Sequence, residues 1–138
     1  MSKIAVIYWS GTGNTQAMAA AVADGAKESG ADVDLLSCAD VNDISAYDAV
    51  ALGCPAMGAE ELEDSEFIPM LESVEPALAG KKVALFGSYG WGDGEWMRSW
   101  ESRCAGKGIS LSADSLIVNE APDDDGIAKC KALGTALA

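Results

Sequence analysis

The sequence contains no histidine among its 138 residues. Histidine is the commonest general base in enzymes, so its absence removes the Ser-His and Cys-His pairs of nucleophilic catalysis. The cysteines are widely spaced and form no Cys-x-x-Cys pair, which argues against a zinc or iron–sulfur site. We expect them to be buried thiols that act as small apolar side chains, with a redox role as the alternative. They are Cys38, Cys54, Cys104 and Cys130.

Positive charge is also scarce. The chain has 9 Lys and Arg against 22 Asp and Glu, giving a net charge of -13. Nucleic acid is therefore excluded as a partner, because binding it requires a basic surface that neutralises phosphates. An acidic surface favours electrostatically steered docking with a basic protein, whereas the simpler alternative is that the charge only maintains solubility.

Long apolar runs are missing, although 49% of the residues are hydrophobic. No run approaches the roughly 20 residues of a membrane span, and the few apolar residues after Lys3 do not resemble a signal peptide. This composition predicts a single domain over residues 1–138, with no membrane association and a cytoplasmic location.

The most informative stretch is an apolar strand, Ile4–Trp9, that runs directly into a loop of hydroxyls and glycines. The loop consists of Ser10, Gly11, Thr12, Gly13, Asn14 and Thr15. A helix follows, and the free N–H groups and dipole at a helix N-terminus favour an anion. The stretch therefore predicts a phosphate-binding loop, the alternative being an ordinary polar turn with a Ser or Thr cap.

The same loop has no Lys or Arg. A P-loop needs a Lys after its glycines, but Gly13 is followed by Asn14. The Gly-x-Gly-x-x-Gly dinucleotide pattern also fails, because Gln16 stands where its third glycine belongs. A neutral loop of hydroxyls and amides instead fits one terminal phosphomonoester.

Three motifs together carry a resemblance. Ser10–Thr15 resembles the FMN phosphate loop of the flavodoxins, Ser/Thr-x-Thr-Gly-x-Thr, and matches it completely. The segments Pro55–Leu62 and Gly87–Gly94 resemble the ring-binding loops of the short-chain clostridial type. The resemblance covers essentially the whole chain, and it implies noncovalently bound FMN in an electron-transfer protein that is not an enzyme.

Hydrophobic periodicity and the positions of turn residues predict that strands alternate with helices along the chain. The predicted strands are 4–9, 32–37 at an edge, 47–54, 81–86 and 109–118, and the predicted helices are 15–29, 64–74, 94–105 and one that starts after Asp123. This order predicts an α/β fold, a doubly wound three-layer sandwich with a five-stranded parallel sheet. The resemblance implies strand order 2-1-3-4-5, and the three loops then lie at one end of the sheet.

The resemblance also assigns the ring site. It implies that Met57 covers the inner face of the flavin and Trp91 the outer face, although taken alone both could be core or partner contacts. The Gly58 carbonyl is expected to flip toward flavin N5, because glycine tolerates a positive φ. Ala59 offers no side-chain acceptor there. Glu60 resembles the acceptor from flavin N3–H, and otherwise is one carboxylate of an acidic run.

The remaining expected FMN contacts come from the same two loops. They are Pro55, Ala56, Ser88, Tyr89, Gly90, Gly92 and Asp93. No catalytic or metal-binding residue is predicted.

These observations favour a low-potential one-electron carrier. It would shuttle between the semiquinone and hydroquinone of FMN and replace ferredoxin between basic-surfaced redox proteins, as a monomer. The alternative is an FMN-dependent NAD(P)H:quinone reductase on the same fold, for which the chain lacks a basic nicotinamide-phosphate site. A phospho-acceptor receiver domain is excluded, because Cys54-Pro55 stands where its acceptor Asp belongs.

The acidic surroundings predict a redox property. Adding an electron to give an anionic hydroquinone is unfavourable near Glu60, Glu61, Asp93 and Glu120, because like charges repel. We expect the second one-electron potential to lie well below that of free FMN, by about 59 mV for each tenfold change in the equilibrium. Potentiometric titration checks this, and a single two-electron wave at the free-flavin value would contradict it.

Overall fold

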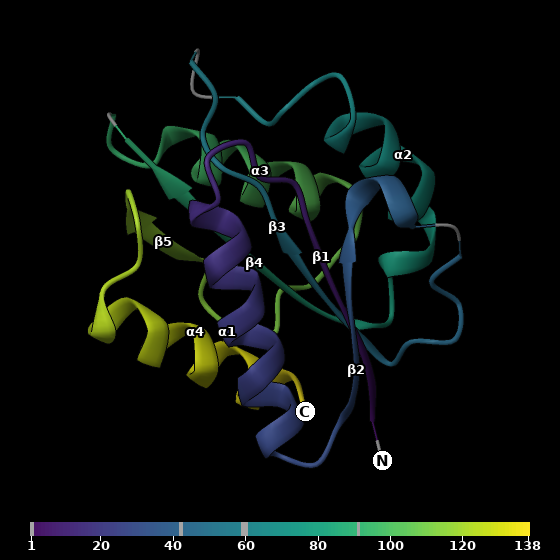
Figure 1. The fold of residues 1–138 in the computed structure, drawn as a ribbon. Coiled ribbons are helices and arrows are strands. Elements are labelled where there is room, and N and C mark those ends of the chain that lie inside the picture. The colour runs from purple at the N-terminus through teal and green to yellow at the C-terminus, as the bar shows by residue number, and fades with distance from the viewer. Residues whose placement is uncertain (1, 42, 59–60, 91) are drawn as a thin grey trace.

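The computed structural model describes residues 2–41, 43–58, 61–90 and 92–138. Over these residues, strands and helices alternate along the chain (Figure 1). The elements are β1 (Lys3–Tyr8), α1 (Asn14–Glu28), β2 (Asp32–Ser37), the 3-10 turn η1 (Cys38–Asp40), β3 (Ala49–Gly53), α2 (Phe67–Leu78), β4 (Lys82–Tyr89), α3 (Glu95–Gly106), β5 (Leu116–Asn119) and α4 (Asp124–Leu137).

Five strands of the described chain form one parallel sheet of order β2-β1-β3-β4-β5, which confirms the predicted topology. β1 is an interior strand that pairs with β2 on one side and β3 on the other, so that Ile4 lies beside both Val33 and Ala49. β2 lies at an edge, as predicted. Because every strand is parallel, their carboxyl ends share one end of the sheet, the upper end in Figure 1.

Two apolar clusters cover the two faces of the sheet. Alternate residues of a strand point to opposite faces. Ile4 and Val6 of β1 pack with α1 and α4, whereas Ala5 and Ile7 pack with α2 and α3. Figure 1 shows this three-layer arrangement, with α1 and α4 side by side. β1 is apolar throughout because both of its faces are buried.

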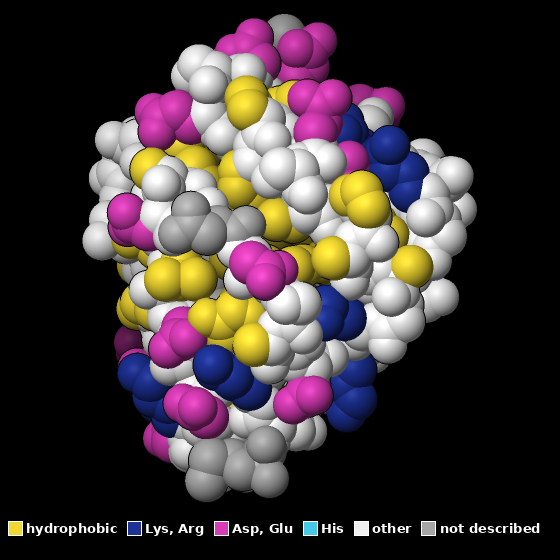
Figure 2. Space-filling model, turned by 90° about the vertical axis from the view of Figure 1, so that its right-hand side faces the viewer, with side chains coloured by type: hydrophobic (Ala, Val, Ile, Leu, Met, Phe, Trp, Pro, Cys, Tyr) yellow, Lys and Arg dark blue, Asp and Glu magenta, His cyan; other side chains and the backbone are white. Residues whose placement is uncertain are grey.

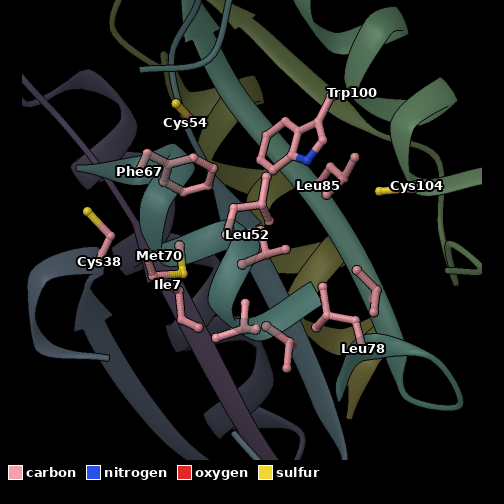
Figure 3. Close-up of a cluster of buried hydrophobic side chains, with 14 of the residues drawn as sticks. Ile7, Cys38, Leu52, Cys54, Phe67, Met70, Leu78, Leu85, Trp100 and Cys104 are labelled. Carbon is pink, nitrogen blue, oxygen red and sulfur yellow. The ribbon is translucent and has the colours of Figure 1, made fainter. Parts of the chain in front are cut away.

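The cluster beneath α2 and α3 holds the largest side chains (Figure 3). Phe67 meets Trp100 edge to face, with ring centroids 5.5 Å apart, a favoured geometry for aromatic pairs. All four cysteines are free and buried. Burial raises the pKa of the Cys54 thiol to about 12 and that of Cys104 to about 11. The expectation of apolar, unpaired thiols therefore agrees with the structure.

Several predicted element boundaries were wrong, most clearly those of α2 and β5. The helix predicted over 64–74 begins at Phe67 and continues through Pro76 to Leu78. Val74 and Leu78 are buried on one face, and this packing outweighs the loss of one helical hydrogen bond at a proline. Residues 109–115 were expected to begin the fifth strand. Only Leu111 forms a bridge there, to Val83, and β5 starts at Leu116.

β4 is longer than predicted and includes residues that were assigned to a loop. It extends to Tyr89, so Gly87 and Ser88 are strand residues. A Cβ at Gly87 would lie 2.2 Å from the carbonyl oxygen of Cys54. Glycine is therefore needed here for the close approach of two backbones, and not for a turn.

The crossing of α1 and α4 generates a prediction. A Cβ at Gly25 would lie 2.1 Å from the carbonyl oxygen of Lys131. Backbone atoms cannot move aside, so we expect Gly25→Ala to lower the free energy of unfolding by about 1–3 kcal/mol. Urea-induced unfolding followed by circular dichroism measures this.

Gly106→Ala is the matched control, because Gly106 also lies in a helix but has no heavy atom within 4 Å of a built Cβ. It should leave stability unchanged or raise it by about 0.4–1 kcal/mol. Equal destabilisation by both substitutions would show that the helix crossing is not the cause.

Candidate functional site

A cleft of about 630 Å³ lies where the carboxyl ends of the strands meet. This volume falls within the roughly 300–1,000 Å³ typical of small-ligand sites. Its lining comes from the segments that follow β1, β3, β4 and β5. The lining residues are Trp9, Gly11, Thr12, Asn14, Pro55, Ala56, Met57, Ser88, Tyr89, Gly90, Glu120 and Ala121.

The loop after β1 is held by its own hydroxyls. Ser10 Oγ accepts a hydrogen bond from Gly13 N (3.0 Å) and Thr12 Oγ1 accepts one from Asn14 N (3.5 Å). Gly13 has φ +95° at the start of α1, a conformation that glycine adopts readily. The loop therefore presents polar groups and the N-terminus of α1 to the cleft, without any cation.

Thr15 has a different environment from the rest of this loop. It is 1% exposed, and its hydroxyl lies 2.9 Å from that of Ser88, which is buried in β4. The Ser88 N–H also donates to Thr15 Oγ1 at 3.4 Å. This pair joins the first turn of α1 to β4 directly below the cleft.

The loop after β3 supplies the apolar part of the lining. Pro55, Ala56 and Met57 all contact the cleft, and Ala56 N donates to Ser88 O (3.0 Å), which fixes the loop against β4. Gly58 is exposed, and a Cβ built on it would meet no heavy atom within 4 Å. Ala59 and Glu60, the next predicted contacts, lie outside the described residues.

Tyr89, the last residue of β4, and Gly90, which follows it, line the cleft, while Trp91 lies outside the described residues. Gly92 and Asp93 are exposed and lead into α3. The Asp93 carboxylate pairs with Arg98 at 2.9 Å. Asp93 therefore faces a cation on α3 in this structure.

Three cleft residues were not among the predicted contacts: Trp9, Glu120 and Ala121. Glu120 has φ +56°, unusual for a residue with a side chain, and its N–H donates to Tyr89 O at 2.7 Å. Asn119 Nδ2 donates to the same carbonyl at 3.2 Å. The sequence carried a signal for this segment, since a fifth parallel strand must end at the same edge as the others.

Acidic side chains are present at this end of the molecule, the upper end in Figure 2, and also lower on the face that this figure shows. The exposed acids at the cleft end are Glu61, Asp64, Glu66, Asp93, Glu95, Glu120 and Asp123. In the described part of the chain, no group of three or more Cys, His, Asp or Glu side chains is arranged to hold a metal ion.

Comparison with known proteins identifies the family of this chain. The sequence profile of the flavodoxin family matches residues 6–134. The chain belongs to the flavodoxin family. It is 49% identical to a flavodoxin of Megasphaera elsdenii over 98% of both chains. It is 51% identical to a flavodoxin of Clostridium beijerinckii over 86% of this chain and 88% of that one.

The fold agrees equally well with a solved flavodoxin. The solution structure of two-electron reduced Megasphaera elsdenii flavodoxin superposes with a TM-score of 0.88 at 47% identity, covering 97% of each chain. The resemblance to short-chain clostridial flavodoxins is thus confirmed.

The function expected from that resemblance is confirmed as well. Flavodoxins are FMN-binding electron carriers rather than enzymes, so this chain is an electron-transfer protein with FMN as its cofactor. Its residues fit that group: a neutral, hydroxyl-rich loop at a helix N-terminus suits a phosphate, and the flank at Met57 suits a flat ring. A quinone reductase is not favoured. Within the described residues, no helix is both long and apolar enough to span a membrane.

The buried hydroxyl pair beneath the cleft leads to a prediction. Thr15→Val or Ser88→Ala leaves one partner unsatisfied, so each should lower the free energy of unfolding by about 1–3 kcal/mol. The double variant should lose less than the sum, with a coupling of about 0.5–3 kcal/mol. Urea unfolding at one fixed FMN concentration measures the cycle, because FMN adds to the apparent stability.

Ser29 and Thr135 provide a matched control cycle. Their hydroxyls lie 3.3 Å apart but are exposed to water. Ser29→Ala combined with Thr135→Val should therefore show a coupling near zero. Additive losses at Thr15 and Ser88 would show that the buried pair makes no effective bond.

Proposed function

We propose that residues 1–138 form one flavodoxin-like domain that holds FMN in the cleft and transfers single electrons to and from basic-surfaced proteins. The observation that supports this most is the cleft itself, with an uncharged phosphate-type loop at one side and Met57 and Tyr89 at the other. When bound, FMN supplies the one-electron chemistry, and the chain binds, orients and shields it.

We assign the phosphate to Ser10, Gly11, Thr12, Gly13, Asn14 and Thr15. Thr12 and Asn14 already line the cleft. The Ser10 and Thr12 hydroxyls accept from loop N–H groups, and a hydroxyl can still donate its own hydrogen to a phosphate oxygen. The positive end of the α1 dipole adds to the attraction.

We assign the ring to the loops after β3 and β4. The contact residues would be Pro55, Ala56, Met57, Gly58, Ala59, Glu60, Ser88, Tyr89, Gly90, Trp91, Gly92 and Asp93. A Cβ built on Gly58 would meet no heavy atom within 4 Å, and glycine tolerates the backbone angles that a peptide flip requires. A Gly58 carbonyl turned into the cleft would accept a hydrogen bond from flavin N5–H.

The distribution of charge over the surface favours a basic protein as the partner. Exposed acids gather at the cleft end, where Arg98 is paired with Asp93 and Glu95. The opposite end carries both signs of charge: it has Lys3, Lys27, Lys81, Lys82 and Lys107, but also the exposed acids Asp24, Glu28, Asp32 and Asp48. A basic protein would therefore be drawn to the flavin end. We further propose that the chain acts as a monomer in the cytoplasm.

The acidic cleft end predicts how the rate of electron transfer depends on salt concentration. The FMN-loaded, reduced protein should reduce a basic c-type cytochrome at least about tenfold more slowly when ionic strength rises from about 0.01 M to about 1 M. Stopped-flow absorbance measures the rate. A protein that takes up no FMN, as judged from its visible spectrum, would overturn the proposed function outright.

A pair of double variants tests the orientation. Glu61→Gln with Asp64→Asn removes two charges at the cleft end, and Asp24→Asn with Asp32→Asn removes two at the other end. We expect the first pair to slow the low-salt reaction severalfold more than the second. Equal effects would show that only the net charge matters.

A further inference from the structure

The inference concerns Glu63, which the sequence presents as one acid in a run of acids. Unlike its exposed neighbours Glu61 and Asp64, Glu63 is 4% exposed. None of the ion pairs found among the described residues includes it. A buried carboxylate without a cation is expensive unless hydrogen bonds satisfy it.

Hydrogen bonds do satisfy it. Glu63 Oε1 accepts from the N–H groups of Glu66 and Phe67, both at 2.7 Å. Glu63 Oε2 accepts from Ser65 N at 2.9 Å and also from the Ser65 hydroxyl. Burial by itself raises the pKa of Glu63, but these bonds outweigh it and lower that pKa to about 2. The group is thus held as an anion.

These donors belong to the beginning of α2. Phe67 is the first residue of α2, and the side chain of Glu66, which precedes it, makes no capping bond. Glu63 therefore satisfies N–H groups that a helix start leaves free, and its charge complements the helix dipole. Phe67 itself is fully buried against Trp100, as Figure 3 shows. The Glu63 carboxylate is consequently held by a residue that is fixed in the core.

The backbone N–H of Glu63 connects this residue to the segment that lines the cleft. Glu63 N donates to Cys54 Sγ at 3.4 Å, and Cys54 precedes the cleft residues Pro55, Ala56 and Met57. The Cys54 carbonyl accepts from Trp96 Nε1 at 3.1 Å. Inside this span, Met57 N donates to Glu61 O at 3.0 Å. Cys54 and Glu63 are thus hydrogen-bonded to each other, and Glu63 is joined to α2 by its carboxylate and by its backbone carbonyl, which accepts from Ile68 N at 3.0 Å.

We propose that Glu63 is a positioning residue for the flavin, whose buried carboxylate anchors the loop of Met57 and Gly58 to α2 and so sets FMN affinity and the one-electron equilibria. The proposal rests on the assignment of the ring to this loop. Its physical basis is preorganisation, since a loop already held in its binding conformation loses less entropy when the ligand binds.

The main test is Glu63→Gln in the FMN-loaded protein. The amide keeps the shape, but its NH₂ group cannot accept from the donors that one carboxylate oxygen serves. We expect the dissociation constant for FMN to rise about tenfold. Electrostatics alone predicts a lower dissociation constant, because removing a negative charge from the protein favours binding of a phosphate dianion. An unchanged or lower dissociation constant would overturn the proposal.

Two further variants separate position from charge. Glu63→Asp keeps the charge but is one methylene shorter, so it should also weaken FMN binding. Asp64→Asn removes one charge from an exposed neighbour and should leave FMN binding unchanged or slightly tighter. If Asp64→Asn weakened binding as much as Glu63→Gln did, the loss would not depend on the buried hydrogen bonds of Glu63, and the positioning role would be refuted.

One-electron potentials supply a readout that a purely structural role would not move. A loosened Gly58 carbonyl stabilises the one-electron reduced protein less, so the first potential should fall in both Glu63 variants. A tenfold change in that equilibrium corresponds to about 59 mV. Removal of charge cannot make the first potential more negative. A first potential equal to that of the wild type in both variants contradicts the proposal.

Hydrogen exchange covers the case in which a variant folds poorly. In the FMN-loaded protein, the Met57 amide should exchange at least about tenfold faster in Ser65→Ala, which removes one donor to Glu63, while amides of β1 keep their protection. Unchanged exchange at Met57 would refute the anchoring. If the wild type bound no FMN, the proposed function would fail instead, so the two failures are distinguishable.

Discussion

N–H and O–H groups, and not cations, stabilise negative charge at several helix starts of this acidic molecule. The Glu63 carboxylate accepts from three backbone N–H groups and one hydroxyl. The Asp123 carboxylate accepts from Gly126 N at the start of α4. The loop before α1 offers the same kind of environment to a phosphate. Helix N-termini thus serve as the recurring anion sites of a strongly acidic chain.

This constraint links the core to the cleft. Parallel strands bring their carboxyl ends together, and the helix that follows each loop begins at the same edge. A side chain that caps such a helix therefore lies next to the loop that binds the ligand. Glu63 is such a side chain at α2, and Thr15, in the first turn of α1, contacts Ser88 of β4. The stability of the fold and the geometry of the site share these contacts.

Much of the fold could be predicted from the sequence. The strand-loop-helix at Ile4–Thr15 has a strong apolar-to-polar transition, and the sheet order followed from a family pattern in three segments. The boundaries that failed involve competing local effects. Pro76 suggests a turn by itself, but buried Val74 and Leu78 keep α2 helical. The polar stretch before Leu116 forms side-chain hydrogen bonds, such as Ser115 Oγ to Glu101, instead of a strand ladder.

The candidate site was predictable where a loop has a distinctive composition. Composition singled out the loop Ser10–Thr15, the resemblance added the segment around Met57, and both border the cleft. Trp9 and Glu120 were missed as contacts because neither stands in a loop of distinctive composition, and only the position of Glu120 after the fifth strand pointed to the cleft. The burial of Glu63 could not be predicted from the sequence for a different reason. Its burial depends on where α2 begins, and a sequence rich in acids gives no sign of which carboxylate turns inward.

The burial of the thiols has a consequence for a protein that handles single electrons. Only a thiolate reacts readily with oxidants or disulfides, and burial raises the pKa of Cys38 and Cys130 to about 11. At neutral pH these groups remain protonated and shielded from solvent. The polypeptide can therefore meet oxygen or peroxide as its cofactor turns over without forming sulfenic acids or mixed disulfides, so oxidative damage should fall on other side chains first.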